Sequence, residues 1–313
     1  MRVAIDARKI RDFGIGTYIR GLIAGLVEIG EDEIVALAPK WAELPPSVEH
    51  LLVDAPKYSI RELFTVGRGI RADVFHAPHY VVPFTKLPTV VTIHDLIHLE
   101  VRNPLKRAYA RTMMRRAARH TVVTVSEAMK REIEGTLGVR EVIVTPNGVD
   151  AHFSPNGPRR GGEYVLFVGN AKPHKNVGAA VEAARRAKIP IVLAGESFEF
   201  FDDLAPLYRG AIALLMPSIE EGFGLPALEA MACGTPVITS NNAALIEVTS
   251  NAALHVDAHD VDGMANAITR IAGDTSLRAQ LASRGIERAR QFTWRRCAER
   301  AREAYAEAVM SDE

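Results

Sequence analysis

The chain has 313 residues with 38 Lys+Arg and 38 Asp+Glu, so its formal net charge is zero. Hydrophobic residues make up 48% and charged residues 24% of the chain, which excludes an intrinsically disordered protein. The lack of a basic excess argues against a nucleic-acid binder, and the length fits two domains.

The first half alternates short β-branched runs with longer amphipathic segments. We expect strands over these ranges: Val3–Ala7, Ile34–Ala38, Asp73–His76, Val90–Ile93, Val122–Val125 and Val142–Thr145. Helices are expected over three ranges between them: Thr17–Ile29, Arg107–Ala118 and Glu127–Leu137. Strands that alternate with helices predict an α/β fold, in which helices cover both faces of a parallel sheet.

A Pro- and Gly-rich segment interrupts this pattern between Pro146 and Gly162. The pattern then restarts, with expected strands at Tyr164–Val168, Ile191–Ala194, Ala211–Met216 and Pro236–Thr239. Expected helices are Val177–Ala187, Leu204–Gly210, Pro226–Cys233 and most of the chain from Asp260. We therefore predict two Rossmann-like domains facing each other across a cleft, over 1–157 and 158–294, followed by a C-terminal helix over 295–313.

The zero net charge conceals a difference between the halves. Residues 1–150 hold 21 basic and 18 acidic side chains, a net of +3, so residues 151–313 carry −3. Much of the basic excess lies in one helical region: Arg102, Lys106, Arg107, Arg111, Arg115, Arg116 and Arg119. This region is either a solvated helix face or a surface for anionic lipid headgroups.

The location of the protein is inferred from three features. Two cysteines, Cys233 and Cys297, form no disulfide framework, which fits a reducing compartment. The N-terminus has no apolar signal-peptide core, and no apolar run approaches the ~18–20 residues of a membrane span. We expect a cytoplasmic protein, with the inner face of the cell membrane as a possible site of contact.

The segment 217–236 carries the strongest chemical signal. A strand ends, a Gly-containing loop turns, and Pro226 begins a helix, so backbone N–H groups of Phe223, Gly224 and Leu225 face whatever lies at the helix N-terminus. Glu221 lies in the loop and Glu229 one turn inside the helix. Amides and the helix dipole favour phosphate, whereas carboxylates accept hydrogen bonds from sugar and ribose hydroxyls.

This segment resembles the signature of the family 4 retaining glycosyltransferases, which have the GT-B fold. Further segments fall in the family's order: Asp6-Ala7-Arg8, Gly14 to Tyr18, Thr92 to Leu96, Val125-Ser126-Glu127, Pro146 to Asp150, Val168-Gly169-Asn170, Pro173 to Asn176 and Phe292-Thr293-Trp294. Taken together, these motifs most resemble the branch of the family that includes the mannosyltransferases of bacterial surface-polysaccharide synthesis. It implies an acceptor-side first domain, a donor-binding second domain and a C-terminal helix that crosses back to the first.

The resemblance also implies roles for single residues. Glu221 would contact the donor sugar hydroxyls, Glu229 the ribose, and Lys175 the donor diphosphate. Amides of Phe223, Gly224 and Leu225 would bind donor oxygens, Gly14 and Gly16 would let the first loop approach the diphosphate, and His94 would face the donor. The acceptor-side candidates are Thr17, Tyr18, His76 and His79, although a packed or solvated side chain is the alternative for the two histidines.

The implied reaction is transfer of a hexose, with mannose favoured, from a nucleotide diphosphate sugar to a glycan or lipid-linked glycan. No side chain is placed as a covalent nucleophile, so same-face displacement with retention is expected. Fixed dipoles and a cation can stabilise the leaving diphosphate, so we expect no metal and no cofactor.

Two features depart from the family pattern. Asn170 stands where many relatives have an Arg that pairs with the lysine, so neutralisation of the diphosphate rests on Lys175, with Lys172 or Arg8 as possible helpers. After Ile191–Gly195, only eight residues precede Leu204. The strand–helix unit that normally helps to form the nucleobase pocket is therefore missing, and we expect a shortened second domain.

The sequence also bears on several other functions. His94 and His98 imitate a zinc-protease pair but follow a strand, and Gly14 and Gly16 lack the third glycine and the acidic ligand of a nicotinamide site. No P-loop sequence is present. A GT-B protein that binds nucleotide or sugar as a non-catalytic partner subunit is the main alternative, and the Glu221/Glu229 spacing argues against a nucleotide-sugar epimerase.

Overall fold

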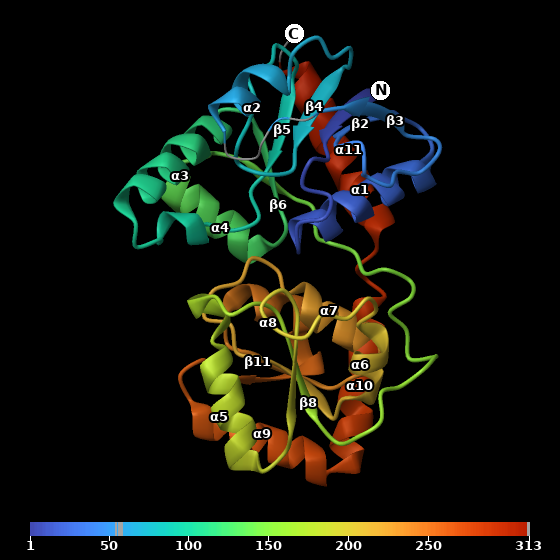
Figure 1. The fold of residues 1–313 in the computed structure, drawn as a ribbon, viewed down its shortest axis with the longest axis vertical. Coiled ribbons are helices and arrows are strands. Elements are labelled where there is room, and N and C mark those ends of the chain that lie inside the picture. Colours follow the sequence, from blue (N-terminus) through green and yellow to red (C-terminus); the bar gives the residue numbers. More distant parts are fainter. Residues whose placement is uncertain (54, 56–58, 312–313) are drawn as a thin grey trace. The chain divides into compact units, whose positions relative to one another are not determined.

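The structure is a computed structural model that describes residues 1–53, 55 and 59–311. It divides into two compact units, which we describe separately (Figure 1). The first unit comprises Met1–Gly148 and Thr293–Glu313, and the second comprises Val149–Phe292. Residues 149–157, which the sequence pattern assigns to the first domain, thus lie with the second unit. Arg209 of the second unit binds this segment, because its Nη1 donates to Ser154 O (3.2 Å), and its Nε donates to Pro158 O just beyond the segment (2.7 Å).

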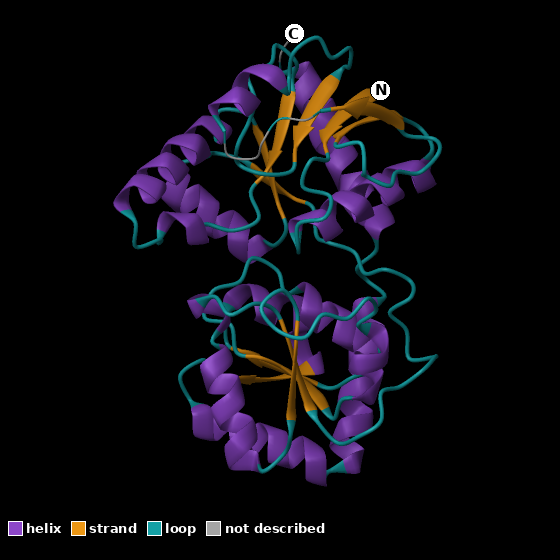
Figure 2. Ribbon diagram, viewed as in Figure 1, coloured by secondary structure: helices purple, strands orange, loops and turns teal. Residues whose placement is uncertain are grey.

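The first unit is built on a parallel seven-stranded sheet with the order β3-β2-β1-β4-β5-β6-β7. Its strands are β1 (Arg2–Asp6), β2 (Glu33–Ala38), β3 (Glu49–Leu52), β4 (Val74–Ala77), β5 (Thr89–Thr92), β6 (Thr121–Thr124) and β7 (Val142–Val144). The central strands are buried apolar runs, as parallel sheets covered on both faces require. Figure 2 shows the strands in orange among the helices in purple.

The helices of the first unit are α1 (Ile15–Ile29), α2 (Ile60–Thr65), α3 (Pro104–Ala117), α4 (Glu127–Leu137), α11 (Trp294–Met310) and a 3-10 turn, η1 (Ile97–Leu99). The C-terminal helix α11 packs along α1. Gly21 and Gly25 make this possible, because a Cβ on either would collide with Trp294.

The second unit has a parallel five-stranded sheet with the order β12-β11-β10-β8-β9. Its strands are β8 (Val165–Val168), β9 (Ile191–Ala194), β10 (Ala213–Met216), β11 (Val237–Ser240) and β12 (Ala253–Val256). Its helices are α5 (Val177–Ala187), α6 (Ala205–Gly210), α7 (Leu225–Ala232), α8 (Ala243–Thr249), α9 (Val261–Gly273) and α10 (Thr275–Ala289), with 3-10 turns η2 (Pro173–Lys175) and η3 (Ser250–Ala252). The segment 195–204 between β9 and α6 contains neither a helix nor a strand, apart from one isolated β-bridge between Glu199 and Ala194.

The prediction of two parallel-sheet α/β domains is confirmed. Within the described residues, none of the helices combines the length and apolar character that a membrane span requires.

Candidate active site

The loop between β10 and α7 forms the centre of the candidate site in the second unit. Gly224 caps α7 with a φ of 104°, and no side chain caps the helix. Pro226 has no N–H and Ala227 N donates to Gly224 O (3.0 Å), so within the described residues the Leu225 amide is the one that this first turn leaves for a ligand. The positive φ requires glycine at this position, and a Cβ on Gly224 would also displace the end of the Leu245 side chain, whose Cδ2 would lie 2.5 Å away. Phe223 is buried and packs edge-on against Phe292, which fixes the loop below the helix.

Lys175 and Glu221 form an ion pair in this loop region. Lys175 Nζ donates to Glu221 Oε2 over 2.6 Å, and the two side chains are only 18% and 15% exposed. Two further bonds join the loops that carry them: Ile219 N donates to His174 O (2.8 Å), and Asn176 Nδ2 donates to Pro217 O (3.3 Å). The structure therefore brings together the predicted diphosphate ligand, Lys175, and the predicted sugar ligand, Glu221. In the free protein the two side chains bind each other.

Glu229, on α7, accepts a hydrogen bond at Oε2 from the hydroxyl of Tyr208 (2.7 Å). Burial raises the pKa of Glu229 to about 7, since the bond from Tyr208 only partly opposes it and the charge of Asp150 adds to it. Tyr208 lies fully buried on α6. The sequence offered no signal for Tyr208, which reads as a core residue of a short apolar helix.

Asn170, just beyond β8, is half-buried and makes a local hydrogen bond. Its Oδ1 accepts a hydrogen bond from Lys172 N (3.1 Å), which closes the turn that leads to Lys175. Arg8, a predicted helper, is 4% exposed and bound to Asp6 and Glu62 in the first unit. Because two carboxylates already neutralise Arg8, we do not expect it to neutralise a diphosphate as well.

Four of the residues predicted in the first unit lie at the start of α1: Gly14, Gly16, Thr17 and Tyr18. Gly14 is the exposed N-cap residue, and Gly16 is buried where a Cβ would collide with Ile10 O. Thr17 Oγ1 accepts a bond from Arg20 (3.1 Å). Tyr18 is fully buried, and its hydroxyl lies 3.0 Å from Thr92 Oγ1, so its ring packs in the hydrophobic core of the first unit.

His76 is also a core residue. Its Nδ1 lies 2.7 Å from the Tyr305 hydroxyl and its Nε2 lies 2.7 Å from Thr92 Oγ1, with no exposed surface. Burial lowers its pKa to about 3, so the ring is neutral at physiological pH. This full burial removes His76 from the acceptor-side candidates. His79 is 7% exposed and its Nδ1 accepts a bond from Val81 N (3.3 Å).

His94 follows β5, where its ring packs edge-on against Tyr18 with 4.8 Å between centroids. Its Nε2 donates to Pro78 O (3.1 Å), and burial lowers its pKa, so the ring is neutral at pH 7 with Nδ1 as the unprotonated nitrogen. This tautomer can accept a hydrogen bond at Nδ1 but cannot supply charge.

Comparisons with known proteins find similar glycosyltransferases. The family model "Glycosyltransferase Family 4" matches residues 14–153, and the model "Glycosyl transferases group 1" matches residues 197–288. The O-antigen chain mannosyltransferase B of Escherichia coli is 26% identical over 76% of this chain and 75% of its own length. The D-inositol 3-phosphate glycosyltransferase of Salinispora arenicola is 42% identical, but over only 34% of this chain and 25% of its own.

Among solved structures, the sucrose-phosphate synthase of Thermosynechococcus elongatus superimposes with a TM-score of 0.80 at 20% identity, over 99% of this chain and 100% of that one. This likeness shows that the two units form the GT-B fold. The chain is therefore similar to the family 4 glycosyltransferases, and among the relatives above it resembles an O-antigen mannosyltransferase.

Proposed function

We propose that the protein transfers a hexose, with mannose favoured, from a nucleotide diphosphate sugar to a glycan or lipid-linked glycan with retention at the reacting carbon. The observation that carries the proposal is the Lys175–Glu221 pair beside the uncapped first turn of α7. A cation and the Leu225 amide at the start of a helix suit a diphosphate, and a carboxylate suits sugar hydroxyls.

In the proposed reaction, the bond between the sugar carbon and the diphosphate oxygen breaks as the acceptor oxygen bonds to the same face. The acceptor's proton passes to the leaving diphosphate, whose negative charge Lys175 and the Leu225 amide stabilise without a metal. Glu221 orients the sugar and Glu229 holds the ribose. The roles of His94, Gly14, Gly16 and Asn170 at the donor stay predictions from the family resemblance.

The test is release of nucleotide from GDP-, UDP-, dTDP- and ADP-sugars in the presence of candidate acceptors. We expect turnover with one hexose donor, GDP-mannose first, and unchanged turnover in excess chelator. Folded protein that is silent with every donor would contradict the proposal.

One observation favours a second candidate, a GT-B subunit that binds nucleotide without transfer. Asn170 brings no charge to the diphosphate, and its amide oxygen already accepts from Lys172 N. Calorimetry with GDP and UDP separates the two: binding without turnover under any donor–acceptor pair supports the subunit.

Nucleotide affinity should rise between pH 6 and pH 8. Glu229 has a pKa of about 7 in the free protein, and its ionised form accepts hydrogen bonds from ribose hydroxyls better than its protonated form. If only the ionised form binds, the affinity for GDP or UDP increases about tenfold over this range. Calorimetry at several pH values between 6 and 8 measures the affinity for GDP and UDP.

The matched control is Glu229→Gln, because the nucleotide phosphates titrate in both proteins and cancel in the comparison. The variant should lose the part of the pH dependence that belongs to Glu229. An affinity that falls with pH in the wild type relative to the variant would exclude the ribose role.

We also propose peripheral contact with an anionic membrane through the first unit. Near α3, Phe64 and Phe84 stack with 5.0 Å between centroids while 60% and 50% exposed, and Leu105 is 80% exposed. The Arg116 guanidinium lies 3.8 Å from the Phe84 ring centroid. Exposed aromatic and aliphatic side chains beside basic ones are typical of membrane-surface helices.

Reversing two exposed charges on α3 should release the protein from anionic vesicles. Arg111→Glu/Arg115→Glu is expected to weaken co-sedimentation with phosphatidylglycerol vesicles by at least ~2 kcal/mol, roughly thirtyfold. Arg284→Glu/Arg290→Glu on α10 and just beyond it makes the same change of net charge elsewhere. Equal loss in both variants, or no binding of the wild type at low salt, contradicts the membrane proposal.

A further inference from the structure

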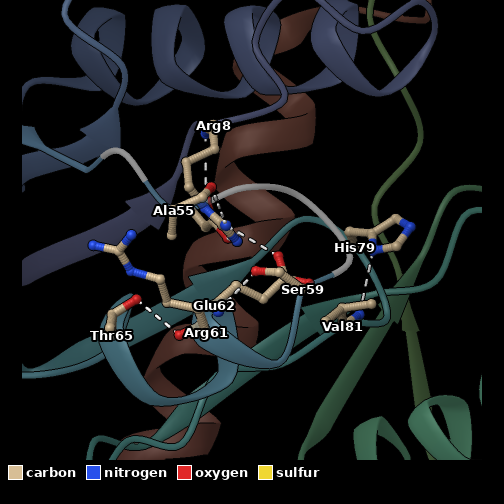
Figure 3. Close-up of polar contacts among 9 residues, drawn as sticks. Arg8, Ala55, Ser59, Arg61, Glu62, Thr65, His79 and Val81 are labelled. Carbon is tan, nitrogen blue, oxygen red and sulfur yellow. Dashed lines mark hydrogen bonds and ion pairs between the residues drawn. The ribbon is translucent and has the colours of Figure 1, made fainter.

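A buried ion cluster lies at the carboxyl end of β1 in the first unit. Arg8 donates from Nε and Nη2 to the two carboxylate oxygens of Asp6 (2.8 and 2.7 Å), and from Nη1 to Glu62 Oε2 (3.0 Å), as Figure 3 shows for Arg8 and Glu62. Asp6, Arg8 and Glu62 are 8%, 4% and 2% exposed. Asp6 ends β1, and Glu62 lies in the first turn of α2, where Ser59 Oγ accepts a bond from Glu62 N.

One atom of this cluster is unsatisfied. Glu62 Oε1 is buried and accepts no hydrogen bond from the described residues. Burial raises the pKa of Glu62 although Arg8 opposes the rise. A buried carboxylate oxygen without a donor is destabilising, so native structures nearly always supply one.

A small cavity adjoins the cluster. It measures about 10 Å³, the space of a single water molecule, and Glu62, Lys9, Ala77 and His79 line it with the other cluster residues. The charges around it cancel: Arg8 and Lys9 are opposed by Asp6 and Glu62. His79 adds no charge, because burial and the nearby cations hold its pKa well below the usual range.

The missing donor must therefore be small and neutral. An ammonium or a phosphate would leave a net charge in this buried place, whereas an O–H group matches the volume and gives Glu62 Oε1 its hydrogen bond. Water and a ligand hydroxyl share this chemistry. The cavity lies where β1 and β4 end, and ligands of open parallel sheets bind beyond the carboxyl ends of the strands.

We propose that this cavity receives a hydroxyl group of a sugar or polyol acceptor, which donates its hydrogen bond to Glu62 Oε1. The inference rests on the proposed glycosyl transfer and adds a defined acceptor subsite to it. Glu62, Arg8 and Asp6 become specificity residues, with Arg8 positioning both carboxylates.

The experiment measures binding of methyl α-D-mannopyranoside, myo-inositol and glycerol to the full chain by ligand-observed NMR. Ala77→Val fills the cavity with two extra carbons and leaves the ion pairs intact; we expect at least tenfold weaker binding of the best probe. Ala108→Val, an exposed position on α3, is the matched control and should bind as the wild type does.

Glu62→Gln is the second variant, in case Ala77→Val does not fold. It keeps the side-chain volume, and its amide oxygen must turn to Arg8, which only donates, so an NH₂ group replaces the acceptor at the cavity. About tenfold weaker binding is expected. Unchanged affinity in a folded variant means that the cavity holds only water and overturns the inference, as does failure of the wild type to bind any probe.

Turnover separates this inference from the proposed function. A chain that binds the sugars through Glu62 but transfers no hexose retains the subsite and loses the proposed function. A chain that transfers hexose with the same acceptor KM in wild type, Ala77→Val and Glu62→Gln retains the function and loses the subsite.

Discussion

Replacing Glu221 by alanine is expected to lower hexose transfer at least a hundredfold while leaving nucleotide affinity unchanged or higher. The two effects have opposite signs because Glu221 occupies Lys175 in the free protein, with 2.6 Å between Oε2 and Nζ. Without the carboxylate, Lys175 meets the diphosphate with no competitor, but the sugar loses the group that orients its hydroxyls. The loss of turnover is of the order seen when one polar group of an active site is removed, about 10²–10³-fold.

The measurements are nucleotide release for turnover and calorimetry with GDP and UDP for affinity. Glu220→Ala, one residue earlier in the same loop, is the matched control and should retain activity. Unchanged turnover in Glu221→Ala would remove this residue from the mechanism. Parallel loss of turnover and nucleotide affinity would assign it to the phosphates or to the loop structure instead of the sugar.

Local patterns made the donor loop predictable. Pro226 and Gly234 place a helix over 226–233, and the structure has it at Leu225–Ala232. Gly224 with φ 104° and the Glu221/Glu229 spacing belong to the same stretch, so a short window contains most of this part of the candidate site. Buried β-branched runs likewise marked most strands, because a parallel sheet covered on both faces leaves that signature.

Elements without such a signature were missed. Strand β3 (Glu49–Leu52) lies at the sheet edge with Glu49, Leu51 and Leu52 exposed, so its sequence shows no buried run. Strand β12 (Ala253–Val256) is the corresponding edge of the second sheet, and His255 breaks its apolar pattern. Edge strands are short and partly solvated, which removes the hydrophobic pattern that identifies central strands.

The sequence also did not predict the roles of residues whose partners lie far away along the chain. His76 was predicted on the acceptor side from its place at a strand end, but its ring meets Tyr305 of the C-terminal helix. Tyr208 and Glu62 look like ordinary helix residues, and only the folded chain brings them to Glu229 and Arg8. Their roles depend on tertiary contacts that no local window contains.

Replacing Lys175 by methionine is expected to reduce both donor affinity and turnover, with turnover falling at least a hundredfold. Methionine keeps the aliphatic length but removes the charge that stabilises the leaving diphosphate. Arg8 cannot compensate, since Asp6 and Glu62 already bind it. Steady-state kinetics with the active donor and calorimetry with GDP measure the two effects, and wild-type kinetics in the variant would refute the role.

The double variant Lys175→Met/Glu221→Gln distinguishes a structural ion pair from two ligands of the donor. Both side chains are more than four-fifths buried, so either single change leaves a poorly solvated charge and lowers stability, and the double change removes that penalty. If the pair only holds the two loops together, thermal stability and turnover should both recover in the double variant. We expect stability to recover and turnover to stay low, because the diphosphate then lacks its cation and the sugar its carboxylate, and a double-mutant cycle on each quantity separates the two couplings.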